Sequence, residues 1–270
     1  MPDLAANGVA LFAISYDSVE ILRNFAATHG IAYPLLSDEG SHVMRRLGLI
    51  NERVQEDHAA YGIQPNARHV NLPYPGAFIL DRDGLVNHKR FYESYRERDT
   101  GTGLLAHALG VVKEPSAPVV TTSSPVTVRA WLDSPTYVFF QRLTLTVEVS
   151  IKSGFCVCAE PSRDGVTPIS IAIDPLEGLE VGTARWPSAH RIARAGFPHG
   201  LWVHEGVVRG TVPLTFAASP GAGDHMVGVT VRYQVFDGVS CLESSSVQLR
   251  VPVREAALIG RSLPSPSSRT

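Results

Sequence analysis

The stretch "GVALFAISYDSVEILRNFAATHG", residues 8–30, sets the pattern of the first half of the chain. It opens with a continuous apolar run, which predicts a β-strand buried on both faces. Asp17 or Ser18 can then cap a helix by accepting hydrogen bonds from the free amides of its first turn, and Gly30 suits a left-handed helix exit. The predicted strand buries Val9, Leu11, Phe12 and Ile14, and the apolar stripe of the helix consists of Ile21, Leu22, Phe25 and Ala26.

The same alternation continues outward from this stretch. "IAYPLLSD", residues 31–38, predicts a second short strand, and "EGSHVMRRLGL", residues 39–49, a second helix. The turn sequence "DRDG" lies between the apolar residues 77–80 and residues 85–91, which predicts a β-hairpin. A last helix is expected over "GTGLLAHALGVV", residues 101–112. Strands that alternate with helices indicate a sheet with helices packed on its faces.

The pattern changes after residue 110. Residues 111–125, "VVKEPSAPVVTTSSP", are rich in Pro, Ser and Thr and predict a linker. Residues 126–253 consist of short alternating segments separated by Gly, Pro and Asp, which predicts an antiparallel β-sandwich. Residues 254–270 are polar and rich in Pro and Ser, which predicts a disordered tail.

Composition narrows the range of functions. The chain has 270 residues, a net charge of −2 and three cysteines. This balanced charge gives no basis for binding nucleic acid or an anionic membrane surface, and no apolar run is long enough to span a membrane. The cysteine spacing matches none of the usual zinc sites, so we expect no metal and no cofactor. Any cysteine chemistry would then be redox chemistry.

Residues 8–110 resemble the alkyl hydroperoxide reductase/thiol-specific antioxidant group of peroxiredoxins, within the thioredoxin-like fold. The resemblance rests on "ALFAISYDSVEILRNFAATHGIAYPLLSDEGSHVMRRLGL", residues 10–49, and "YPGAFILDRDGLV", residues 74–86. It implies a reactive cysteine at the start of a helix, where the helix dipole lowers the thiol pKa. No cysteine precedes Cys156, so the peroxidatic residue of the family cannot be assigned to any position, and we expect no peroxidase activity from this chain.

The resemblance also implies that the first core strand of the family precedes Met1. We therefore expect residues 1–110 to form an incomplete thioredoxin-like domain, produced by a truncated or misplaced start or by a decayed gene. The family carries a cis-proline beside its active-site thiol, and Pro75 is the matching position. We accordingly expect a cis bond between Tyr74 and Pro75, with both residues in contact with substrate. The alternative is a trans proline that opens an edge strand.

Residues 140–253 resemble the amino-terminal, immunoglobulin-like domain of the DsbD family of thiol:disulfide interchange proteins. The closing segment "VTVRYQVFDGVSCLESSSVQLRVPV", residues 229–253, carries much of this resemblance. The family places two cysteines in its final hairpin, and the matching positions are Phe236 and Cys241. The resolving cysteine is therefore absent from the hairpin. Cys241 can form a disulfide with Cys156, with Cys158 or with a cysteine of a partner protein.

Cys156 and Cys158 lie in "GFCVCAEP", where an alternating strand points both side chains to one face. This spacing suits either a redox pair or two thiols packed against the core, and we favour the core, which is where free cysteines are most often found. The resemblance to DsbD implies no cysteine at either position. Both residues therefore remain candidates beside Cys241.

The expected fold is an incomplete α/β thioredoxin-like domain plus an all-β immunoglobulin-like sandwich. The two resemblances imply a thiol-based redox protein that acts on a thiol or disulfide partner. The alternative is a non-catalytic binding module built on the β-sandwich, in which the thiols are incidental. No export signal is recognisable in the sequence, and work outside the cytoplasm would require one upstream of Met1.

Overall fold

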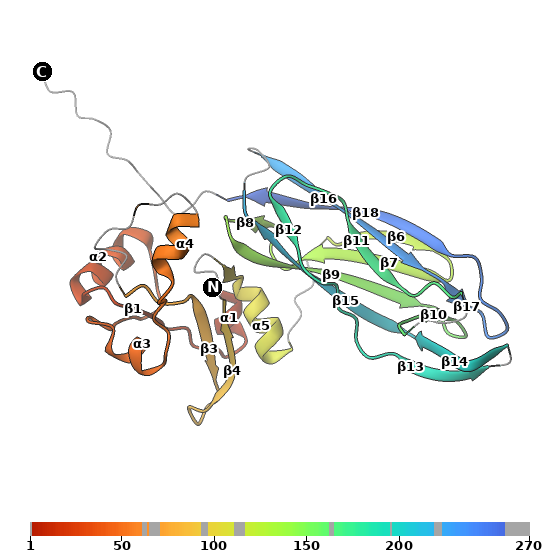
Figure 1. Cartoon of the computed structure of the whole chain (residues 1–270), viewed down its shortest axis with the longest axis horizontal. Helices are drawn as coiled ribbons and strands as arrows, with labels where there is room; N and C mark the ends of the chain where they lie inside the picture. The colour runs from red at the N-terminus through yellow and green to blue at the C-terminus, as the bar shows by residue number, and fades with distance from the viewer. Residues whose placement is uncertain are drawn as a thin grey trace, which may run out of the picture. The chain divides into compact units, whose positions relative to one another are not determined.

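The computed structural model describes residues 2–60, 64, 71–92, 97–110, 117–161, 165–194, 196–218 and 223–256. These residues form two compact units, the first ending at residue 110 and the second running from residue 117 to residue 256 (Figure 1). The first unit mixes helices with strands. The described part of the second unit contains strands and no helix.

The first unit has short elements. Its helices are α1 (Pro2–Ala6), α2 (Val19–His29), α3 (His42–Arg46), α4 (Val54–Ala60) and α5 (Gly101–Leu109). Its strands are β1 (Ala13–Ser15), β2 (Leu35–Ser37), β3 (Gly76–Leu80), β4 (Val86–Phe91) and β5 (Arg98–Asp99). Among the described residues, no helix combines the length and the apolar character that a membrane crossing requires.

The sequence correctly predicts the order strand, helix, strand at the start of this unit. β1 and β2 pair in parallel, with Ala13 opposite Leu35, and α2 connects them. Ser18 caps α2, since its hydroxyl accepts a hydrogen bond from the amide of Ile21 at 3.4 Å. Gly30 ends the helix in the left-handed conformation at a φ of 61°, which glycine adopts without a steric penalty.

The prediction that the first strand is buried on both faces is wrong. β1 has only 3 residues, and the side chains of Phe12 and Ile14 are 58% and 45% exposed. Among the described residues, β1 pairs with β2 alone, and β3 and β4 form a separate sheet. The side chains of Phe12 and Ile14 therefore lie largely in solvent. The helix stripe is covered only in part, because Leu22 is buried whereas Ile21 and Phe25 are exposed.

The predicted hairpin is confirmed. β3 and β4 pair in antiparallel register, with Ala77 opposite Arg90. The carboxylate of Asp81 accepts hydrogen bonds from the amides of Asp83 and Leu85, at 3.0 and 2.9 Å. This side-chain bonding stabilises the turn that "DRDG" predicts.

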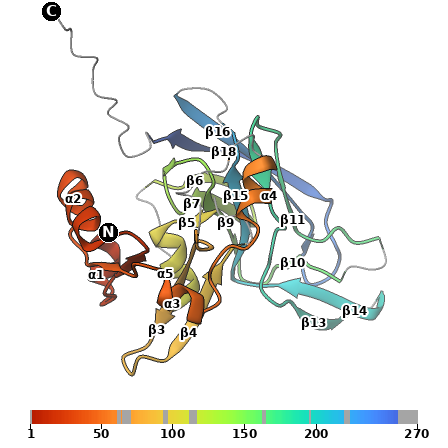
Figure 2. The same cartoon turned by 60° about the vertical axis from the view of Figure 1, so that its left-hand side comes forward.

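The described residues of the second unit form three sheets. Their strand orders are β12-β15-β9-β7-β6, β11-β16-β18-β8 and β13-β14-β10-β17. Figures 1 and 2 show β10, β13 and β14 together at one end of this unit. The strands are β6 (Val119–Ser123), β7 (Val126–Leu132), β8 (Thr136–Tyr137), β9 (Gln141–Ile151), β10 (Cys156–Cys158), β11 (Ser170–Ile173), β12 (Leu179–Val181), β13 (His190–Arg194), β14 (Phe197–His204), β15 (Val207–Phe216), β16 (Asp224–Tyr233), β17 (Val235–Phe236) and β18 (Ser245–Glu255).

The main core of the second unit joins side chains of β9 with side chains of β16 and β18. β9 is a central strand, because it pairs with β7 on one side and with β15 on the other. Alternate side chains of a strand share a face, and in β9 and β16 those that face the core are apolar. These residues are Leu143, Leu145, Val147 and Val149 of β9 and Val227, Val229 and Val231 of β16.

Two predicted boundaries need correction. The linker predicted over residues 111–125 contains β6, whose Val119 and Thr121 pair with Ala130 and Val128 of β7. The β-branched residues of "VVTTS" favour a strand, and this preference outweighs the Ser and Thr content that suggested a linker. The tail predicted from residue 254 begins too early, because β18 continues to Glu255. Residues 111–116 and 257–270 lie outside the described residues.

Replacing a core leucine should destabilise the second unit. Leu145→Ala removes a fully buried side chain, and we expect the free energy of unfolding to fall by about 2–5 kcal/mol. Val207→Ala changes a position on β15 that is 62% exposed and should cost at most about 1 kcal/mol. Urea unfolding followed by tryptophan fluorescence reports on this unit, since Trp131, Trp186 and Trp202 all lie in it. Equal losses in the two variants would contradict this assignment of the core.

Candidate functional site

Two of the three cysteines lie on β10, between β14 and β17. Cys156 stands opposite Phe236 of β17, and Cys158 stands opposite Val203 of β14. Because successive side chains of a strand point to opposite faces, both thiols lie on one face of β10 and Val157 lies on the other. Val157 belongs to the main core. The two thiols therefore face away from the main core.

The third cysteine reaches the same face through a tight turn after β17. Phe236 and Cys241 form an antiparallel bridge, and residues opposite each other in such a bridge share a face. The carboxylate of Asp237 accepts hydrogen bonds from the amides of Val239 and Ser240, both at 2.8 Å. This Asx-type turn folds Cys241 back beside β17.

Cys158 and Cys241 are in direct contact. Their Sγ atoms are 3.9 Å apart, although 83 positions separate the two residues in the sequence. A disulfide bond is about 2.05 Å long, so its formation requires the sulfurs to approach by about 2 Å. Cys156 has a different contact, because its thiol donates to the backbone carbonyl oxygen of Phe236 at 3.9 Å. All three cysteines are free thiols.

A small apolar group surrounds these sulfurs, separate from the main core. We call it the thiol cluster, and its members are Cys156, Cys158, Leu201, Val203 and Phe236, with Cys241 packed against them. The ring of Phe197 meets that of Phe236 edge-on, with centroids 6.1 Å apart. The guanidinium carbon of Arg194 lies 5.9 Å from the centroid of the Phe236 ring, within the range of a cation–π contact. Aromatic side chains thus shield one side of the thiols from water.

The three thiols differ in exposure. Cys158 is fully buried and Cys156 is 4% exposed, whereas Cys241 is only partly buried. A thiol that reacts with a partner has to be accessible from solvent. Cys241 is therefore the cysteine that a partner can reach, and Cys158 lies behind it.

Burial also determines the acidity of the two thiols of β10. It raises the pKa of Cys156 to about 11, with a further increase from the Glu205 carboxylate and an opposing effect from Arg194. Burial raises the pKa of Cys158 well above the ordinary value for a thiol, and the neighbouring Cys241 adds to this effect. Both residues are therefore neutral thiols at neutral pH.

Cys241 experiences opposing effects. Partial burial raises its pKa, the hydrogen bond from the Cys158 thiol lowers it, and the Asp237 carboxylate raises it again, with a net increase. The Cys158 S–H therefore stabilises a thiolate on Cys241, and the same contact holds the proton on Cys158. The contact therefore favours the thiolate on the more accessible sulfur and the proton on the buried sulfur.

Tyr74 and Pro75, the predicted substrate-contact residues, lie in the first unit. The prediction of a cis bond before Pro75 is wrong, because the cis bonds among the described residues precede Pro125 and Pro161. The carbonyl of Pro75 accepts a hydrogen bond from the amide of Tyr92 at 3.4 Å, and β3 begins at the next residue. Pro75 therefore opens a strand as a trans proline, which is compatible with the ladder because proline keeps its carbonyl acceptor.

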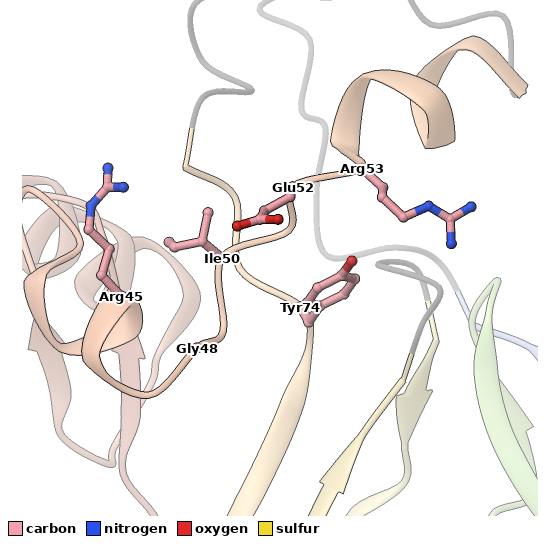
Figure 3. A pocket seen from close by; sticks show the side chains of 6 residues that line it. All are labelled: Arg45, Gly48, Ile50, Glu52, Arg53 and Tyr74. Carbon is pink, nitrogen blue, oxygen red and sulfur yellow. The ribbon is translucent and has the colours of Figure 1, made fainter.

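Tyr74 also lines a surface pocket of about 460 Å³ (Figure 3). The other lining residues are Arg45, Gly48, Ile50, Glu52 and Arg53. Figure 3 shows the Arg45 and Arg53 side chains pointing in different directions. Arg45 donates to the side-chain oxygen of Asn71 at 2.6 Å, and Arg53 pairs with Glu56 at 3.1 Å. The charged groups of this pocket therefore do not converge on one ligand position.

Metal binding finds no support in the described part of the chain, where no three His, Cys, Asp or Glu side chains are grouped to hold an ion. Sequence reasoning named all three cysteines and left open whether Cys241 pairs with Cys156, with Cys158 or with a partner protein. It missed Gln234, whose side chain bonds to segments beside Cys158 and Cys241. No sequence signal marks that role, because the bond to Thr167 joins residues 67 positions apart.

The fold and this site define a two-unit protein with a pair of contacting thiols in its all-β unit. The family model of the AhpC/TSA family matches residues 1–89, which are 89 of the 270 residues. This match implies a thioredoxin-like fold for the first unit and points to thiol-redox proteins in general. No curated protein sequence matches the chain.

Solved structures show looser likenesses. The N-terminal periplasmic domain of ScsB from Proteus mirabilis is 15% identical, with 48% of this chain and 49% of that chain covered and a TM-score of 0.34. The reduced N-terminal domain of DsbD from Neisseria meningitidis is 13% identical, with 51% and 84% covered and a TM-score of 0.28. The chain thus spans about half the length of the ScsB structure that it matches. Likenesses at this level do not establish a shared function.

Alkylation should distinguish the three thiols. In the folded chain, iodoacetamide should modify Cys241 first, and Cys156 and Cys158 only after denaturation, because these two are buried. The alkylation rate of Cys241 should rise with pH through a midpoint above the ordinary value of 9.0, because its pKa is raised and only the thiolate reacts. Peptide mass spectrometry measures both the order and the rates.

Two variants provide the controls for this experiment. Cys158→Ala removes the S–H donor and should move the midpoint for Cys241 further upward, whereas Cys156→Ala should leave it unchanged. A midpoint below 9.0, or equal labelling of all three thiols in the folded chain, would contradict the assigned environments.

Proposed function

We propose that the chain is a thiol–disulfide exchange protein whose reactive pair is Cys158 and Cys241. The 3.9 Å contact between their Sγ atoms is the observation that carries this proposal. Cys156 lies on the same face of the same strand, yet its thiol bonds to a backbone carbonyl, so a shared face alone does not produce a sulfur–sulfur contact. The AhpC/TSA match of residues 1–89 supports thiol-redox chemistry in general.

The proposed reaction uses a disulfide of a partner as the electron acceptor. The Cys241 thiolate attacks one sulfur of the partner disulfide, which forms a mixed disulfide and releases the other sulfur as a thiolate. Cys158 then loses its proton to this released thiolate or to solvent and attacks the Sγ of Cys241. This second step releases the other partner thiolate, which is protonated by solvent. One dithiol and one disulfide thus become one intramolecular disulfide and two thiols, with two electrons transferred.

The environment of Cys158 and Cys241 bears on whether the pair donates electrons to a disulfide or accepts them. A dithiol is weakly reducing when its thiolate is stabilised, because stabilisation of the reduced form makes the disulfide a strong oxidant. Cys158 and Cys241 lack this stabilisation, since burial raises the pKa of both thiols. We therefore propose that the reduced pair donates electrons to disulfides.

The resemblance to the final hairpin of the DsbD family supports a redox role for Cys241. The hairpin of that family carries its two cysteines at the positions of Phe236 and Cys241, which face each other here across the turn. We propose that Cys158, on the neighbouring strand β10, acts as the resolving thiol in place of the residue at position 236. Residues 1–110 contain no cysteine, so we propose no thiol-peroxidase step in the first unit.

Exchange with glutathione disulfide tests the proposed function. One reduced chain should consume one molecule of glutathione disulfide, release two molecules of glutathione and gain a Cys158–Cys241 disulfide, as measured by acid quenching and mass spectrometry. Cys158→Ser should stop at a mixed disulfide between Cys241 and glutathione, because the resolving thiol is gone. Cys241→Ser should abolish the reaction, and Cys156→Ser is the matched control that should retain it.

The opposite pattern would support the binding-module alternative. If all three thiols stay reduced in the presence of glutathione disulfide until the chain is denatured, then the cysteines are core residues and the exchange function is wrong. Loss of the intramolecular disulfide in Cys156→Ser would show that the reactive pair includes Cys156. This result would equally overturn the proposal.

A further inference from the structure

Gln234 connects the two segments that carry the reactive sulfurs. It lies between β16 and β17, and its side-chain NH₂ donates to the carbonyl oxygen of Leu242 at 2.8 Å. Leu242 directly follows Cys241. The side-chain oxygen of Gln234 accepts a hydrogen bond from the amide of Thr167 at 2.7 Å. One amide side chain thus uses a donor and an acceptor on two different segments.

The segment around Thr167 is itself bonded to Cys158. The amide of Ile169 donates to the carbonyl oxygen of Cys158 at 2.8 Å, and the amide of Cys158 donates to the backbone carbonyl of Gln234 at 2.9 Å. The hydroxyl of Ser244, three residues after Cys241, bonds to the hydroxyl of Thr167 at 2.9 Å. These bonds form a connected network between the backbone at Cys158 and the backbone that follows Cys241.

We infer that Gln234 is a positioning residue that holds Cys241 against Cys158. This inference rests on the proposed exchange function, and it names the residue that sets how readily the pair closes. The turn that carries Cys241 is exposed at Gly238, Val239 and Ser240, and the Asp237 side chain fixes its tip, whereas Gln234 bonds the segment that follows Cys241. The amide of Leu242 donates to the carbonyl of Val235 at 2.7 Å, and the Gln234 side chain bonds the carbonyl of that same Leu242.

The expected effect follows from comparing the reduced and oxidised states. In the reduced chain the Gln234 bonds keep the Cys241 segment close to Cys158, so little conformational entropy remains to be lost when the disulfide forms. In the oxidised chain the disulfide itself holds this segment. Removing the side-chain bonds therefore frees the reduced state more than the oxidised state, and the equilibrium constant for closing the disulfide falls.

The experiment measures this constant in the full-length chain. Wild type, Gln234→Met and Gln234→Glu are equilibrated with mixtures of glutathione and glutathione disulfide, quenched with acid and analysed by mass spectrometry. Met keeps the length of the side chain without either hydrogen bond, and Glu keeps the acceptor for Thr167 without the donor for Leu242. We expect each variant to lower the constant for the Cys158–Cys241 disulfide about tenfold, the loss that one or two neutral hydrogen bonds imply.

Two controls separate positioning from general damage. Gln248→Met changes an exposed glutamine on β18 and should leave the constant within about twofold of wild type. In a Cys158→Ser background, Gln234→Met should leave the equilibrium of the Cys241–glutathione mixed disulfide unchanged, because that reaction does not require the two protein sulfurs to meet. A residue with a merely structural role would shift both equilibria.

Three results would overturn the inference. Constants within about twofold of wild type in both Gln234 variants would show that the side chain does not position Cys241. A wild-type constant in Gln234→Glu beside a lowered constant in Gln234→Met would show that the bond to Leu242, by which Gln234 is inferred to hold Cys241, has no effect. An equal shift of the mixed-disulfide equilibrium would show an effect on the Cys241 thiol itself. In each case the wild type still forms its disulfide, whereas a wild type that forms none would refute the exchange function as well.

Discussion

The thiol cluster depends on the position of β10 between β14 and β17. This pairing directs Val157 into the main core and turns Cys156 and Cys158 to the opposite face. A strand has a side-chain period of two residues, so a register shift of one residue would exchange these faces. The sulfurs would then lie in the main core, away from Cys241. The backbone register therefore decides whether this chain has a pair of contacting thiols.

Burial and reactivity act against each other in this cluster. A fully buried thiol resists ionisation and cannot meet a partner, and Cys158 has both properties. It contacts the partly buried Cys241, so one sulfur of the pair remains accessible, and we propose that the buried sulfur behind it acts as the resolving thiol. We propose that the dithiol acts as an electron donor, since burial does not stabilise its thiolate form.

Features of the fold that depend on a few neighbouring residues were predictable from the sequence. Features that depend on contacts between distant segments were not. Ser18 and Gly30 mark the ends of α2 because a cap and a left-handed exit depend on a few neighbouring residues. The exposure of Phe12 was not predictable, because it depends on which strand lies beside β1. The contact of Cys158 with Cys241 was one of two pairings that the sequence left open, since 83 positions separate the two residues. Only the assembled sheet distinguishes between these pairings.

A crystal structure of the full chain after mild oxidation tests the central claim most directly. The account predicts continuous electron density between the Sγ atoms of Cys158 and Cys241, at a separation of about 2.05 Å, with Cys156 still a free thiol and Phe236 still opposite Cys241. Density that joins Cys241 to Cys156, or three separate oxidised or unmodified sulfurs, would contradict it.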